Sequence, residues 1–177
     1  HDERALQVLF EFCLTFEEFR RALIDIRHVA ALRGKRRFVV TFFAGALSVL
    51  AFAPVFLFPV LFITMPILVW LVDGSKGPRS AAAAGWIFGF GYFLANLFWI
   101  GEAFLVEAEK FAGLMPFAVT ILPAGLALFW AGATAVARCF WRSDASRVLV
   151  LAITLSLAEW LRGHVLTGLP WNVLGYA

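Results

Sequence analysis

Charge is scarce in this chain. Lys, Arg, Asp and Glu make up 15% of its 177 residues, whereas soluble domains contain about 25%. Hydrophobic residues make up 62% of the chain and the mean hydropathy is +0.86, well above the roughly 45–50% apolar content of soluble domains. This composition excludes an ordinary soluble domain and predicts a membrane protein. The net charge of +3 is too small to indicate nucleic acid as a partner.

The sequence also has few residues of the kind that carry chemistry. Its two cysteines, Cys13 and Cys139, are too far apart for a disulfide framework or a redox pair. His28 and His164 have no neighbours at metal-ligand spacing, so we expect neither a metal nor another cofactor. A Ser-His-Asp arrangement, a Gly-rich phosphate loop and an H-E-x-x-H pattern are all missing from the sequence. We therefore expect no catalytic residue in this chain.

Residues 1–37 differ from the rest because they hold about half of all the charges. Apolar residues recur in this segment at the spacing of an amphipathic helix, at Phe12, Phe16, Phe19, Leu23 and Ile26. Such an extension either lies as a helix on the membrane surface or is poorly ordered and has no chemical role. It has no apolar core followed by a small-residue cleavage site, so we expect no signal peptide here.

From Phe38 onward, long apolar runs alternate with short polar breaks. A helix that crosses the hydrocarbon layer needs about 20 mostly apolar residues. The pattern predicts an all-α fold, a polytopic transmembrane helix bundle with about five spans, in a domain that covers residues 38–177. The expected spans lie near residues 38–53, 56–72, 81–100, 114–137 and 148–161, and a re-entrant or interfacial segment follows at 162–177.

Proline and glycine refine this arrangement. Pro54 and Pro59 disfavour helix at the residue before each, so they mark a tight hairpin between the first two spans. Gly85, Gly89 and Gly91 in the third span would let a neighbouring helix approach closely.

The charges in the loops alternate in sign along the chain. Basic residues precede the first span and occupy the loops after the second and fourth spans, whereas the loop after the third span is rich in Glu. The basic residues are Lys35, Arg36, Arg37, Lys76, Arg79, Arg138, Arg142 and Arg147, and the acidic ones are Glu102, Glu107 and Glu109. By the positive-inside rule, the amino terminus is cytosolic and residues 159–177 lie at the opposite face. That face is the periplasmic one in a Gram-negative bacterium.

Two charged residues near the end of the chain are the first candidates for a site. Glu159 and Arg162 are three positions apart at the end of an apolar run, so they share a helix face and can pair. The pair either fixes the exit of the helix from the membrane or binds a phospholipid, and Gly163 beside it is expected to have a structural role. In the second case the guanidinium of Arg162 holds the phosphate and Glu159 orients it.

The turn that follows is the second candidate. Gly168 and Pro170 break the helix, and Trp171 suits the headgroup level of the membrane. This turn either packs on the bundle or forms the lip of an acyl-chain groove. In the third span, Asn96 and Trp99 lie about one turn apart, and the Asn96 amide is expected to make a structural hydrogen bond to another helix.

Several of these blocks together resemble one known family, the bacterial apolipoprotein N-acyltransferases. The most specific block runs from Glu159-Trp160-Leu161-Arg162-Gly163 through Thr167-Gly168-Leu169-Pro170-Trp171 to Gly175-Tyr176. Further similar blocks are Ala51-Phe52-Ala53-Pro54 with Pro59, residues 66–71, residues 85–94 and Trp99-Ile100-Gly101. The resemblance covers roughly residues 38–177, and the third span with its Glu-rich loop is most similar to alphaproteobacterial members.

The resemblance implies a function in the bacterial inner membrane. Members of the family transfer an acyl chain from a phospholipid to the amino group of a diacylglyceryl-modified apolipoprotein, so the expected partners are these two substrates and the lipid bilayer. The family's chemistry belongs to a periplasmic nitrilase-like domain with a Glu-Lys-Cys triad, and neither Cys13 nor Cys139 matches its motif. We therefore expect this chain to be the membrane portion of such an enzyme, a fragment that is inactive alone.

A different class of function stays open at this point. A small membrane transporter or a structural membrane subunit would also have this composition. A transporter would use polar residues and broken helices near the middle of the membrane, for which Asn96 and Pro123 are the available features.

Overall fold

A computed structural model describes residues 29–105, 112–165 and 173–176 of the chain. Within these residues the structure is all-α, as predicted, and contains no strand. Its α-helices are α2 (Gly34–Leu47), α3 (Leu61–Asp73), α4 (Pro78–Leu97), α5 (Ile100–Leu105), α7 (Met115–Cys139) and α8 (Ser146–His164). Short 3-10 helices are η1 (Ser48–Ala51), η2 (Phe58–Val60), η3 (Ala112–Leu114) and η4 (Leu174–Tyr176).

The helices lie close to the predicted segments, but several of their ends differ. The first segment was expected to reach residue 53, but α2 ends at Leu47 and η1 continues only to Ala51. The second was expected to begin at residue 56, but α3 begins at Leu61 after η2. The third segment was expected to reach residue 100, but α4 ends at Leu97 and a separate helix, α5, begins at Ile100. The last helix was expected to end near residue 161, but α8 continues to His164. Helix α2 begins at Gly34, inside the charged segment that was assigned to the extension.

Two helices are long and apolar enough to cross a membrane by length and composition, namely Pro78–Leu97 and Met115–Cys139. The apolar helix at Phe58–Asp73 is shorter than this limit. Pro54 and Pro59 do lie in a tight reversal, because η1 and η2 meet there and the Leu57 amide donates to the Leu50 carbonyl over 2.7 Å.

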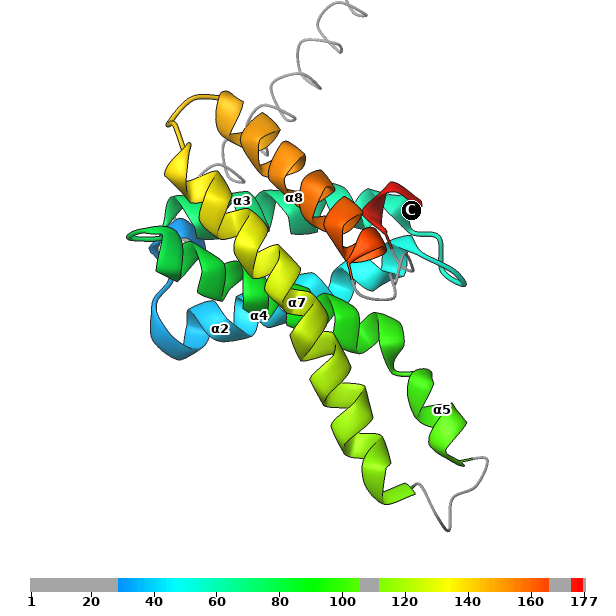
Figure 1. The fold of residues 1–177 in the computed structure, drawn as a ribbon. Coiled ribbons are helices and arrows are strands. Elements are labelled where there is room, and N and C mark those ends of the chain that lie inside the picture. Colours follow the sequence, from blue (N-terminus) through cyan, green and yellow to red (C-terminus); the bar gives the residue numbers. More distant parts are fainter. Residues whose placement is uncertain (1–28, 106–111, 166–172, 177) are drawn as a thin grey trace, which may run out of the picture.

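Helix α4 occupies the centre of the bundle (Figure 1). It packs against α7 on one side and α2 on another, while α8 returns alongside α7 and α3 contacts α2 and α4. Glycines permit the close approach, as predicted. A Cβ atom at Gly85 would overlap with Thr134 of α7, and one at Gly91 would overlap with the Phe42 carbonyl of α2. Packing of this kind replaces the hydrophobic effect as the cause of association between helices in lipid.

Aromatic rings fill the space between α4 and α7. The indole of Trp130 stacks on Phe88 and on Tyr92, with ring centroids 5.5 and 5.2 Å apart, and all three side chains are fully buried. Thr134 also joins the two helices, because its hydroxyl donates to the Ala81 carbonyl over 3.0 Å. The core of the bundle therefore lies along the contact between α4 and α7.

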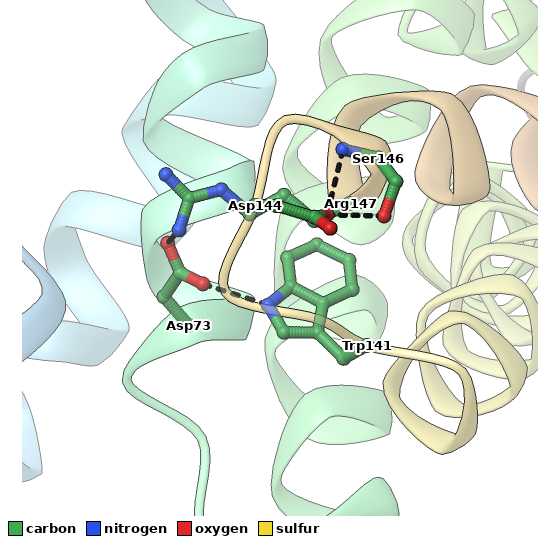
Figure 2. A network of polar contacts seen from close by, with 5 residues as sticks. All are labelled: Asp73, Trp141, Asp144, Ser146 and Arg147. Carbon is green, nitrogen blue, oxygen red and sulfur yellow. Dashed lines mark hydrogen bonds and ion pairs between the residues drawn. The ribbon is translucent and has the colours of Figure 1, made fainter.

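Polar contacts join several elements at the end of the bundle where α3 ends and α8 begins. The carboxylate of Asp73 accepts hydrogen bonds from Trp141 Nε1 at 2.7 Å and from Arg147 Nη1 at 2.9 Å (Figure 2). In the same loop, Asp144 accepts from the amide and the hydroxyl of Ser146, and these bonds hold the pKa of the Asp144 carboxyl below its usual range. The α7–α8 connection is thereby attached to the end of α3.

Three arginines complete this end of the bundle. Arg37 donates to the Leu71 carbonyl at 2.7 Å and to the Ser75 hydroxyl at 2.6 Å. Arg33 donates to the Gly74 carbonyl and Arg138 to the Ser75 carbonyl, at 3.1 and 2.9 Å. Cations at the carboxyl end of a helix satisfy its last carbonyls and its dipole. These arginines therefore cap α3.

Removal of the Asp73 carboxylate is expected to loosen this end. Asp73→Ala loses both bonds in Figure 2 and should lower the free energy of unfolding by about 1–2 kcal/mol, since the ion pair is partly exposed. Asp73→Asn keeps an acceptor for Trp141 and should lose less. Thermal unfolding in detergent micelles measures the difference, with Arg142→Gln, an exposed change in the same loop, as the control. Equal stability of Asp73→Ala and the wild type would contradict this assignment.

Candidate functional site

The predicted charged pair lies on the buried face of α8. Glu159 is 9% exposed and Arg162 is 2% exposed, in line with Leu151, Leu155 and Ala158. The opposite face of the same turns is apolar and open, with Trp160 57% exposed. Both charged side chains therefore point into the bundle, as their positions three residues apart on one helix face allow.

The guanidinium of Arg162 lies over an aromatic ring of α4. Its central carbon is 5.0 Å from the centroid of Phe93, within the range of a cation–π contact. Tyr92 is fully buried beside Phe93 on α4, with ring centroids 5.1 Å apart. Arg162 thus connects α8 to the centre of the bundle.

Asn96 lies one turn after Tyr92 on α4 and is 8% exposed. The hydrogen bond from the Asn96 amide to another helix stays a prediction. In the part of the chain that the structure describes, Asn96 Nδ2 and Trp130 Nε1 have no hydrogen-bond partner. Tyr92 and Asn96 of α4 with Glu159 and Arg162 of α8 form what we call the α4–α8 polar cluster, and Trp130 of α7 stacks on its Tyr92.

Glu159 links α8 to the segment after it. Its Oε1 atom accepts a hydrogen bond from the Leu174 amide of η4 at 3.3 Å. A groove of about 370 Å³ opens beside this contact. It is lined by Ser156, Glu159, Trp160, Gly163, His164, Val173 and Gly175. The carboxylate therefore lies at the wall of an open groove and holds η4 to α8.

A second, almost wholly apolar groove of about 380 Å³ lies between α7 and α8. Its walls include Phe129 and Gly132 of α7 and Leu157 and Leu161 of α8. Leu161 lies beside Arg162 in sequence, so this groove ends near the polar cluster. Its dimensions and apolar walls are compatible with a hydrocarbon chain.

The structure brings together only some of the predicted site residues. Glu159, Arg162, Gly163 and Asn96 lie at the same end of the bundle, and Trp99 lies just after α4 with 44% of its surface exposed. Gly168, Pro170 and Trp171 lie outside the described residues. Sequence reasoning missed Tyr92, Phe93, Trp130 and Leu174. The position of Tyr92, one turn before Asn96 in an apolar run, was the available signal for the first of these.

Comparison with known proteins shows the family. A family model described as the apolipoprotein N-acyltransferase N-terminal domain matches residues 44–177. The chain is 57% identical over 149 residues to the apolipoprotein N-acyltransferase of Rhodopseudomonas palustris, an alignment that covers 81% of this chain and 28% of that protein. It is 49% identical over 158 residues to the protein of that name from Sinorhizobium medicae, covering 84% and 30%, and 46% identical to the one from Brucella suis with the same coverage.

The chain therefore spans less than a third of the length of these relatives, which come from alphaproteobacteria. The matched region includes every described helix from η1 to η4 and all residues of the α4–α8 polar cluster. This chain belongs to the apolipoprotein N-acyltransferase family, of which it contains the N-terminal domain.

Proposed function

We propose that this chain is the membrane portion of an acyltransferase that takes an acyl chain from a phospholipid and transfers it to the amino terminus of a diacylglyceryl-modified lipoprotein. The family match over residues 44–177 carries this proposal, and the names of the relatives give its activity. The transfer needs an activated nucleophile with donors for the oxyanion, and Cys139, the described cysteine, is an exposed free thiol at the end of α7. On this proposal, residues 1–177 alone are inactive.

The proposed arrangement in the inner membrane follows the loop charges. Residues 1–37 form a charged extension on the cytosolic side, and five apolar segments in residues 38–177 cross or enter the bilayer. The clustering of Arg33, Arg37, Arg138 and Arg147 at one end of the bundle supports a cytosolic position for that end. The α4–α8 polar cluster then lies near the periplasmic face.

At that face, the proposed role of the site is to admit and position the phospholipid. The headgroup would occupy the groove beside Glu159, with Pro170 and Trp171 at its lip, and an acyl chain would lie in the apolar groove between α7 and α8. The burial of Arg162 against the Phe93 ring favours an anchoring role for the guanidinium over direct contact with phosphate. If this site held the lipid at a fixed position relative to a separate catalytic domain, proximity would accelerate the acyl transfer.

A chimaera tests the proposed function directly. The region that the Rhodopseudomonas palustris relative shares with this chain is replaced by this chain's sequence, and the product is expressed in a strain depleted of its own N-acyltransferase. We expect mass spectrometry of a lipoprotein amino terminus to show N-acylation. A chimaera that inserts into the membrane but leaves the lipoprotein diacylated would argue against the proposal, and the relative without this region is the control for background activity.

A further inference from the structure

The reversal between α2 and α3 lies within the longest uncharged stretch of the chain. No Asp, Glu, Lys, Arg or His occurs between Arg37 and Asp73. The other reversals carry charge, Lys76 between α3 and α4 and Arg142 with Asp144 between α7 and α8. A loop that stands in water normally contains polar side chains. This difference sets the α2–α3 reversal apart.

The two arms of this hairpin are short. At the rise of α- and 3-10 helices, the uncharged part of α2 with η1, residues 38–51, is roughly 23 Å long. The arm formed by η2 and α3, residues 58–72, is roughly 24 Å long on the same basis. The hydrocarbon layer is about 30 Å thick. With the arginine-rich end at one border of that layer, the reversal stops short of the other border.

The backbone of the reversal is suited to a site with little water. The exclusion of loops from lipid follows from the cost of unsatisfied N–H and C=O groups, and here most donors are satisfied locally. Pro54 and Pro59 have no N–H to satisfy. Five amides of the reversal donate to nearby carbonyls at 2.7 to 3.1 Å. The donor and acceptor pairs are Phe52 to Val49, Val55 to Phe52, Phe56 to Phe52, Leu57 to Leu50 and Val60 to Leu57.

The side chains of the reversal form an exposed apolar surface, which we call the hairpin tip. It consists of Val55, Phe56, Leu57, Phe58, Phe62 and Ile63, each between 47% and 72% exposed. Phe56 has a φ of 53°, a region that aromatic residues seldom adopt, and its ring is the most exposed of the set. In water such a patch would be costly, whereas acyl chains would solvate it.

Inner contacts hold the hairpin in place. The Ser48 hydroxyl donates to Thr64 Oγ1 at 2.8 Å and joins the two arms. The ring of Phe52 packs edge-on against Tyr92, with centroids 6.0 Å apart. The tip is therefore fixed to a member of the α4–α8 polar cluster.

We propose that the hairpin tip is a lipid-binding surface, which inserts its apolar side chains among the acyl chains of the leaflet farther from the arginine-rich end. This inference rests on the proposed membrane function and deepens it. The tip would contact lipid acyl chains just beneath the headgroups, on the side of the bundle where Phe52 meets Tyr92.

Site-directed spin labelling in the complete polypeptide tests the proposal without relying on cysteine. A nitroxide is attached by click chemistry to Phe56→azidophenylalanine, and the protein is placed in vesicles of phosphatidylethanolamine and phosphatidylglycerol. Leu128→azidophenylalanine, exposed on α7, is the lipid control, and Ser143→azidophenylalanine, exposed in the α7–α8 loop, is the water control. Collision rates with oxygen, which concentrates in lipid, and with a water-soluble nickel chelate are compared.

We expect the oxygen-to-nickel ratio at position 56 to exceed that at position 143 severalfold and to lie below that at position 128, which is at the middle of α7 and therefore deeper in the bilayer. A ratio like that at position 143 would place the tip in water and overturn the proposal. Shielding of position 56 from both probes would also overturn it, because another part of the polypeptide would then cover the tip. A low ratio at position 128 itself would instead contradict the membrane bundle on which the proposed function rests.

Discussion

Gly85→Ala should lower the free energy of unfolding by about 2–3 kcal/mol, although it adds a single methyl group. The new Cβ atom would overlap with Thr134 Oγ1 and lie 2.6 Å from the Trp130 carbonyl oxygen. A side chain can rotate away, but the carbonyl belongs to the backbone of α7. The two helices must therefore separate along their whole contact, which includes the stacked rings of Phe88 and Trp130.

Gly132→Ala on α7 is the matched control. A Cβ atom at Gly132 meets nothing within 4 Å, so the same change there should be neutral or should stabilise the helix by up to about 1 kcal/mol. Thermal unfolding of both variants in one detergent compares them. The double change Gly85→Ala with Thr134→Ala should recover only part of the loss, because the backbone overlap persists. Equal stability of the Gly85 and Gly132 variants would contradict the close contact between α4 and α7.

Loss of either member of the buried charged pair should also have a large effect. Arg162→Ala removes a fully buried guanidinium and its contact with Phe93, and Glu159→Ala removes the buried acceptor of the Leu174 amide. Loss of one buried, hydrogen-bonded or charged group typically costs about 1–3 kcal/mol. We expect both variants to insert into the membrane, to unfold at lower temperature and, in the complete polypeptide, to reduce N-acylation of a lipoprotein substrate.

The double variant Glu159→Leu with Arg162→Leu separates the two roles of the pair. Apolar residues of similar size often replace a buried ion pair without loss of stability. If the pair only anchors α8 to α4, the double variant should recover both stability and N-acylation. Recovery of stability alone would assign Arg162 or Glu159 a direct role toward the lipid. Wild-type unfolding and acylation in Arg162→Ala would contradict both roles, and Arg142→Ala, exposed and outside the site, is the control.

Much of this fold follows from local patterns in the sequence. Apolar runs near helix length predicted every long helix, the two prolines predicted the reversal between α2 and α3, and glycine spacing predicted the close contacts of α4. These signals act within one turn or one helix. The separate helix α5 was missed because Ile100 continues the apolar run of α4 and no proline or charge precedes it.

The partners of the charged residues were less predictable. The spacing of Glu159 and Arg162 showed that they share a face, but Phe93, which contacts Arg162, lies on another helix. The loop charges were counted only for their sign, whereas Arg138 caps α3 and Arg147 pairs with Asp73, contacts that are 63 and 74 residues apart in sequence. Pairing over such separations depends on how the helices are arranged, which periodicity within a single helix does not specify.

The arginine caps on α3 have a consequence for how the bundle moves. Arg33, Arg37 and Arg138 with the Asp73 contacts fasten α2, α3, α7 and α8 to one another at one end. Toward the other end, α7 and α8 face each other across an apolar groove, and the described residues of its walls make no side-chain hydrogen bond from one helix to the other. The arginine-rich end would then act as a hinge. Small rotations of α8 relative to α7 about this hinge would widen the groove between the two helices at the end that holds Glu159 and Arg162.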